Sequence, residues 1–169
     1  MNKHPKLKIY PTRNELFIEF AAFLLLVFFW IISISSFGYL PDEIPIHYNG
    51  LGEVDAYGDK ETIFILPLIA TLLFIMLSIF SKFPHTFNYS VEITKENAEK
   101  QYKNAINLIR LLKIAVLLIF IFINYKTIQI ALEKNKNLGI WFLPVAILFL
   151  FTLITYNLYK TYKINQNSN

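Results

Sequence analysis

Three stretches of the chain, residues 20–41, 62–81 and 137–159, contain no charged residue. They are 22, 20 and 23 residues long and consist largely of Phe, Leu, Ile, Val and Ala. A helix rises about 1.5 Å per residue, so roughly 20 apolar residues cross a hydrocarbon layer about 30 Å thick. The pattern therefore predicts three membrane-spanning helices.

A fourth span is predicted around a shorter apolar run, residues 114–125. Alone this run would cover only about 18 Å as a helix. If the helix covers residues 108–130, Arg110 and Lys113 lie near one end and Lys126 near the other, where long side chains can reach the headgroups. We therefore predict spans at residues 21–37, 63–80, 108–130 and 140–158.

The predicted fold class is an all-α membrane protein with four transmembrane helices in one domain, residues 1–164, followed by a disordered tail at 165–169. The alternative is a soluble protein with one very large core. Hydrophobic residues make up 55% of the 169 positions and fall in unbroken blocks, which leaves few polar residues to cover such a core. The lipid bilayer is therefore the expected surrounding.

Lys and Arg are distributed unequally between the two sides of the predicted spans. Twelve lie in the N-terminal segment, the loop 81–107 with the start of the third span, and the tail, against four on the opposite side. The positive-inside rule then predicts both termini in the cytoplasm. The first apolar run is longer than the 7 to 15 residues typical of the apolar h-region of a signal peptide, so we expect an uncleaved anchor. The net charge of +4 follows this asymmetry and gives no nucleic-acid footprint.

The predicted cytoplasmic loop, residues 81–107, contains a helix start. Thr94 is a good N-cap for a helix that continues through Ala98 and Tyr102 into the third span. Two interpretations remain: an amphipathic lead-in lying along the headgroups, or a signalling surface at residues 95–103.

The predicted outer loop, residues 38–61, has turn-forming residues at closely spaced positions. Ile44, Ile46 and Tyr48 alternate with other residues ahead of Asn49-Gly50, a strong tight-turn signal. Prolines stop the first helix and favour extended backbone, and glycines mark positions suited to positive φ. We predict a short ordered loop, such as a small hairpin, with a structural motif of Pro41, Pro45, Gly52 and Gly58.

The same loop carries the candidate binding residues. Six acidic residues against one lysine give it a net charge of −5, which would attract cations or a cationic peptide. The chain has no cysteine, which excludes disulfides and thiolate metal sites, and no nucleophile with an adjacent base is evident. We expect no cofactor and no bound metal. The candidate ligand-binding residues are His47, Asn49, Asp55 and Lys60.

At this loop the sequence resembles a known family, called domain of unknown function 1648. The family pattern has a Leu-Pro start, Ile-Pro-x-His, Asn-x-x-Gly, then an Asp and Gly-x-Lys. Those positions here are Leu40, Pro41, Ile44, Pro45, His47, Asn49, Gly52, Asp55, Gly58 and Lys60. The resemblance implies a bacterial cytoplasmic-membrane protein related to the module of SdpI-type proteins, which protect against a secreted toxic peptide and hold a repressor at the membrane. Those proteins have further spans after this region.

Four functions are compatible with the sequence. The first is a membrane protein that recognises an extracellular peptide or envelope partner in immunity or signalling. The second is an outward-facing metal-dependent enzyme, for which His47 and neighbouring carboxylates supply fewer ligands than zinc usually takes. The third is a small transporter, although Glu19, Arg110 and Lys113 lie near the inner boundary and not at mid-membrane depth. The fourth is a cytoplasmic signalling partner.

Overall fold

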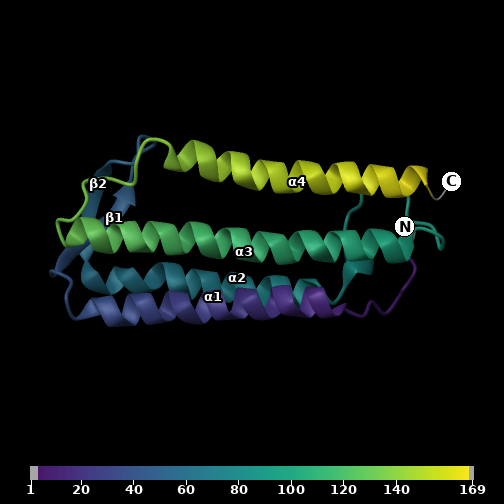
Figure 1. Ribbon diagram of the computed structural model, residues 1–169, viewed down its shortest axis with the longest axis horizontal. Coiled ribbons are helices and arrows are strands. Elements are labelled where there is room, and N and C mark those ends of the chain that lie inside the picture. The colour runs from purple at the N-terminus through teal and green to yellow at the C-terminus, as the bar shows by residue number, and fades with distance from the viewer. Residues whose placement is uncertain (1–3, 168–169) are drawn as a thin grey trace.

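The computed structural model describes residues 4–167 and contains four long helices and one small sheet. Figure 1 shows the helices side by side along the long axis, with the sheet at one end and both termini at the other. We name these ends the hairpin end and the terminal end. In chain order the elements are α1 (Arg13–Phe37), β1 (Glu43–Tyr48), β2 (Val54–Asp59), the 3₁₀ helix η1 (Lys60–Phe64), α2 (Ile65–Phe80), the 3₁₀ helix η2 (Pro84–Thr86), α3 (Ala98–Ala131) and α4 (Phe142–Gln166).

The four predicted spans are confirmed by helices that are long and apolar enough to cross a membrane, α2 doing so together with η1. The protein is therefore a multi-pass membrane protein. α3 has 34 residues, which corresponds to about 51 Å and exceeds the hydrocarbon layer. Its first turns therefore continue the helix beyond the membrane, in line with the span, and do not form a separate lead-in along the headgroups (Figure 1).

Two helix ends differ from the prediction. α3 begins at Ala98 with Asn97 as N-cap, three residues after the expected cap. Thr94 instead forms a reciprocal pair with Asn97, since each backbone N–H donates to the other's side-chain oxygen. At the other terminus α4 runs to Gln166, so the first residues of the expected disordered tail are helical. Residues 168–169 of that tail lie outside the described part of the chain.

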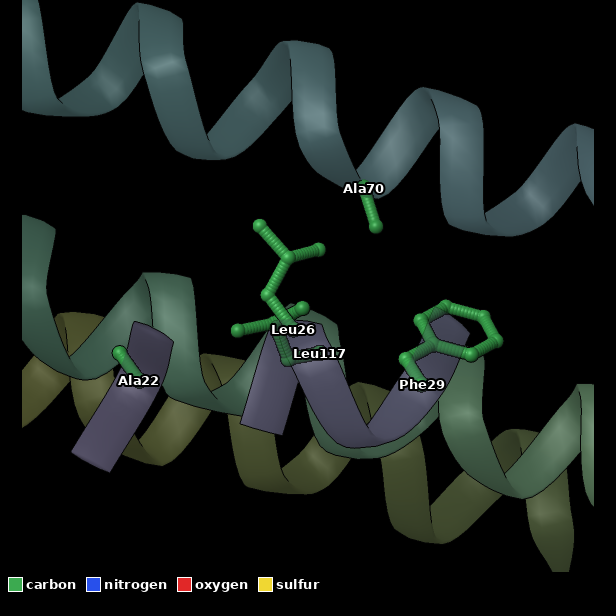
Figure 2. Close-up of a cluster of buried hydrophobic side chains, with 5 residues drawn as sticks. All are labelled: Ala22, Leu26, Phe29, Ala70 and Leu117. Carbon is green, nitrogen blue, oxygen red and sulfur yellow. The ribbon is translucent and has the colours of Figure 1, made fainter. Parts of the chain in front are cut away.

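The main apolar contact joins α1, α2 and α3. Ala22, Leu26 and Phe29 of α1 are buried with Ala70 of α2 and Leu117 of α3. Figure 2 shows Ala70 pointing from α2 toward the layer in which Leu26 and Phe29 lie. Lipid tails are as apolar as these side chains, so close packing drives helix association here, and alanines allow the backbones to approach.

Buried hydrogen bonds connect the same three helices nearer the hairpin end. The Asn124 amide of α3 donates to the Ser33 hydroxyl of α1 at 2.9 Å, and both residues are buried. The Trp30 indole N–H donates to Thr71 of α2 at 2.9 Å. Polar side chains within membrane helices commonly hold neighbouring helices together, and Ser33 and Asn124 do so here.

The sequence predicts that the Arg110 and Lys113 side chains extend to the headgroups, but both turn into the bundle and pair with carboxylates. Arg110 pairs with Glu15 at 3.1 Å and with Glu19 at 3.2 Å, and Lys113 pairs with Glu19. The Lys113 side chain is 1% exposed and its ammonium also donates to Ser78 of α2 at 3.1 Å. The carboxylates of Glu15 and Glu19 on the neighbouring helix α1 explain the difference, because a buried cation is stable only when paired.

α4 packs against α3 through polar side chains near the terminal end. The Asn104 amide of α3 donates to the Thr161 hydroxyl at 2.9 Å, and the Asn157 amide donates back to the Asn104 carbonyl at 3.0 Å. Toward the hairpin end the two helices instead border an apolar groove of about 580 Å³ between Leu118 and Phe149. The two halves of this interface are therefore held differently.

Candidate functional site

The predicted outer loop folds as a two-stranded antiparallel hairpin. Glu43 pairs with Asp59 at its base and Tyr48 with Val54 near its turn, and the register shifts between Pro45 and His47. Proline lacks an N–H for the ladder, and bulges are where strands accommodate it. The shift ends the simple alternation expected from the sequence. Ile44 is 1% exposed, whereas Ile46 is 48% exposed.

The turn is closed by Asn49. Its side-chain oxygen accepts hydrogen bonds from the backbone N–H groups of Leu51 and Glu53, and its amide donates to the Glu53 carboxylate at 2.9 Å. Gly52 has φ of 79°, a left-handed conformation that glycine adopts without strain. A Cβ at Gly52 would also lie 2.9 Å from the Gly139 carbonyl oxygen.

The turn contacts the α3–α4 connection. The Leu138 N–H donates to the Gly52 carbonyl at 2.8 Å, and Glu53 forms an isolated antiparallel bridge with Asn137. Gly139 also has positive φ, 98°, which brings its backbone against Gly52. The hairpin therefore holds the start of α4 through backbone bonds.

The hairpin also packs on the ends of the helices. Ile44 is buried with Leu40, Ile63 and Ile128, where α1, η1 and α3 meet. The Tyr48 hydroxyl hydrogen-bonds the Thr127 hydroxyl of α3 at 2.7 Å, and burial raises the pKa of Tyr48. This hydrogen bond was not predicted from the sequence. The one indication available was that a tyrosine in a half-buried strand needs a partner for its O–H.

The base of the hairpin is joined by Asp42 and Lys60. The Lys60 ammonium donates to the Asp42 carboxylate at 2.8 Å and lies 5.7 Å from the centre of the Phe37 ring. The hydrogen bond from Lys60 lowers the pKa of the Asp42 carboxyl. Asp59, which precedes Lys60, is the N-cap residue of η1, but its side chain forms no capping hydrogen bond.

His47 and Asp55 form a cross-strand pair on the hairpin surface. The His47 Nδ1 lies 2.6 Å from Asp55 Oδ1, and the two side chains are 69% and 42% exposed. An imidazole held by a carboxylate keeps its other ring nitrogen available for a further hydrogen bond. The pair is therefore accessible to a molecule that approaches the hairpin.

The structure separates the four candidate binding residues into two groups. His47 and Asp55 lie together on the surface, whereas Asn49 and Lys60 are used in the turn and at the base. Of the predicted structural residues, Pro41 links α1 to β1 and Pro45 is buried in β1. Gly52 has the expected positive φ but Gly58 does not; a Cβ at Gly58 would lie 3.0 Å from the Ile46 side chain.

A cavity of about 350 Å³ lies beside β1, against the ends of α2 and α3. Its lining is mainly apolar and includes Ile46, Ile65 and Ile123. The polar residues of the lining are Tyr48, Thr62, Asn124 and Thr127. Among the residues that the structure describes, no three His, Cys, Asp or Glu side chains are grouped to hold a metal ion. The arrangement presents a polar pair and an apolar hollow on one hairpin.

Comparison with known proteins identifies the segment that contains this hairpin. Residues 24–71 match the model of the family described as a domain of unknown function (DUF1648). No curated protein and no solved structure matches the chain. The matched residues cover most of α1, the hairpin, η1 and the start of α2, and the loop motif lies inside them. Residues 24–71, which run from within α1 through the hairpin to the start of α2, are therefore similar to a DUF1648 domain.

Proposed function

We propose that this protein is a non-enzymatic bacterial cytoplasmic-membrane protein that recognises an extracellular peptide or envelope partner, in immunity or in signalling. The hairpin end faces the outside and both termini lie in the cytoplasm. The observation that carries the proposal is the exposed His47–Asp55 pair, presented on a hairpin that other contacts hold in place.

Several contacts besides this pair hold the hairpin in place. Asn49 closes its turn, Ile44 and Tyr48 attach it to the helices, and Asp42 with Lys60 joins its base. Binding residues commonly lie on loops that a rigid scaffold holds in position. His47 and Asp55 are therefore the contacts proposed for the partner.

Charge and shape favour an amphipathic cationic peptide as the partner. The loop has a net charge of −5, which would raise the encounter rate of a basic peptide. The cavity beside β1 would take an apolar side chain of that peptide, with Tyr48 and Thr127 at its wall. Immunity and signalling come from the resemblance of this module to SdpI-type proteins, and the shared domain supports the module alone.

Orientation is tested by reporter fusions. Fusions after Gly50 and Asn137 are expected to be active only with an extracytoplasmic reporter, and fusions after Asn97 and Asn165 only with a cytoplasmic one. The unequal distribution of Lys and Arg is the physical reason. A cytoplasmic signal at Gly50 would reverse the proposed orientation.

Recognition is tested by photocrosslinking in intact cells. A photoreactive amino acid replaces Tyr57 of β2, which is 60% exposed, and the matched control replaces Tyr162 of α4, which is 59% exposed at the terminal end. Capture of an extracellular peptide at position 57 and not at 162 is expected. His47→Ala and Asp55→Ala should lower peptide affinity about tenfold, as for loss of one charged hydrogen bond.

A second control separates specific contact from general charge. Asp59→Asn removes an exposed acid from the same hairpin and should change affinity much less. All three variants should retain normal amounts of folded protein. Equal losses of peptide affinity in Asp59→Asn and Asp55→Ala would indicate non-specific charge attraction only. Purified protein that binds a metal through His47 and turns over a substrate would instead favour the metal-dependent enzyme.

A further inference from the structure

A second cavity, of about 360 Å³, lies at the terminal end between α1, α3 and α4. Its lining includes two cationic side chains, Arg110 and Lys160, with one acidic side chain, Glu15. Amide and hydroxyl groups complete the polar part of the wall; they come from Thr12, Asn14, Asn104, Asn107, Tyr156 and Asn157. The charged groups of the lining therefore sum to a formal +1.

Arg110, the buried cation of this cavity, is held in place by three side chains and is 7% exposed. Its guanidinium pairs with Glu15 at 3.1 Å and Glu19 at 3.2 Å, and donates to the Asn107 side-chain oxygen at 2.7 Å. Lys160 is exposed and forms no ion pair within residues 4–167. One cation is thus preorganised, and the other is available to an incoming anion.

On α1 and α4 the polar lining residues lie toward the terminal end and the apolar ones toward the hairpin end. Asn14 precedes Ile18 on α1, and Lys160 follows Leu153 on α4, which runs in the opposite direction. On α3 Asn104 and Asn107 come first, and Arg110 lies between Leu108 and Leu111. The cavity is therefore polar toward the terminal end and apolar toward the middle of the bundle.

The depth of the cavity matches a membrane surface. Asn14, Arg110 and Lys160 lie roughly 27 to 35 Å along their helices from the helix ends at the hairpin end. The hydrocarbon layer is about 30 Å thick, so these residues fall at the headgroup level of the leaflet at the terminal end.

We propose that this cavity binds the phosphate group of an anionic phospholipid from that leaflet. The positive charge comes from Lys160, since Arg110 is already paired with Glu15 and Glu19. The Arg110 guanidinium, the Tyr156 hydroxyl and the Asn14 amide supply further N–H and O–H donors. The acyl chains lie against Ile18, Leu111 and Leu153. Basic pockets between membrane helices are suited to anionic headgroups, and lysine binds phosphate as a point charge. This site is separate from the hairpin and does not depend on its proposed role.

The test measures lipid retention by the full-length protein. Native mass spectrometry of protein taken from bilayers of equal phosphatidylglycerol and phosphatidylcholine should show preferential retention of phosphatidylglycerol. Lys160→Gln should lower the affinity for that lipid about tenfold. Lys163→Gln is the matched control, because Lys163 is also exposed on α4 but does not line the cavity. Tyr156→Phe and Tyr159→Phe form a second matched pair, with a loss expected only at position 156.

Three outcomes would overturn the proposal. Equal losses in Lys160→Gln and Lys163→Gln would indicate diffuse surface charge, and equal retention of the two lipids would exclude selection of an anion. Saturable thermal stabilisation by glycerol 3-phosphate, without retained lipid, would assign the cavity to a soluble phosphate ester. Unchanged melting temperatures of the variants in lipid-free detergent would show that any loss arises from binding and not from misfolding.

Discussion

The two ends of the molecule use pairs of ionisable side chains in opposite ways. At the terminal end Glu19, Arg110 and Lys113 are paired between helices, and Lys113 is almost fully buried. At the hairpin end His47 and Asp55 are paired on the surface, and an apolar residue, Ile44, makes the buried contact. A cluster of buried ion pairs therefore holds helices together at one end, whereas a polar pair is left accessible at the other.

The reason is the solvent. In the bilayer, apolar side chains gain little by leaving lipid, so hydrogen bonds and ion pairs distinguish one helix neighbour from another. Above the bilayer, water favours burial of Ile44 and solvates the polar pair without cost. The difference implies that mutations should damage the two ends through different mechanisms.

The largest expected effect comes from breaking the ion pairs at the terminal end. Glu19→Ala would leave Lys113 without its carboxylate and Arg110 with only one, at a cost of about 3 kcal/mol in the free energy of unfolding. Unfolding monitored in mixed micelles measures this. The control is Glu99→Gln, which breaks an exposed i,i+4 pair with Lys103 and should have no measurable effect. A similar stability for both variants would contradict the importance of burial.

The next largest effect is expected from a substitution that disrupts the backbone geometry at the hairpin end. Gly52→Val places a β-branched residue at φ of 79° with its Cβ 2.9 Å from the Gly139 carbonyl, and should cost about 2 kcal/mol. Proteolysis of the turn and of the α3–α4 connection should accelerate together. Gly50→Val is the matched control, because no atom lies within 4 Å of a Cβ there. Normal protease resistance of Gly52→Val would argue against an ordered hairpin.

A smaller effect is expected where α4 is held to α3. Thr161→Val removes the hydroxyl that accepts from Asn104, at a cost of about 1 kcal/mol, while Asn104 keeps its bond to the Asn157 carbonyl. The melting temperature in detergent should fall by roughly 2–4 °C. Thr152→Val serves as control, since its hydroxyl bonds only the Leu148 carbonyl of its own helix. Equal shifts would show that this contact does not hold α4.

The smallest effect concerns pH at the base of the hairpin. The pKa of Asp42 is lowered by Lys60, so the stabilisation it provides is present above the unfolded pKa of about 3.9 and lost as pH falls through the folded pKa. The protection factors of the hairpin amides, which are corrected for the pH dependence of intrinsic exchange, should therefore fall more between pH 6 and 3 in the wild type than in Asp42→Asn. Identical profiles would show that the pair does not stabilise the folded hairpin.

Local patterns were sufficient for much of the fold. Uncharged runs predicted the spans, and Asn49-Gly50 after alternating apolar residues predicted the hairpin. Contacts between distant segments were not predictable. The sequence places Arg110 and Lys113 where snorkelling would suffice, yet Glu19 lies 91 and 94 residues earlier and is the partner that keeps both buried.

The sequence by itself determined the environment and the local chain geometry of this protein, because hydropathy over about 20 residues and turn chemistry over a few residues are local properties. It also marked His47, Asn49, Asp55 and Lys60 as one group. Only the tertiary structure decided that Asn49 and Lys60 support the hairpin while His47 and Asp55 remain accessible. That distinction depends on which atoms meet across strands and between helices, and no single stretch of sequence specifies those distances.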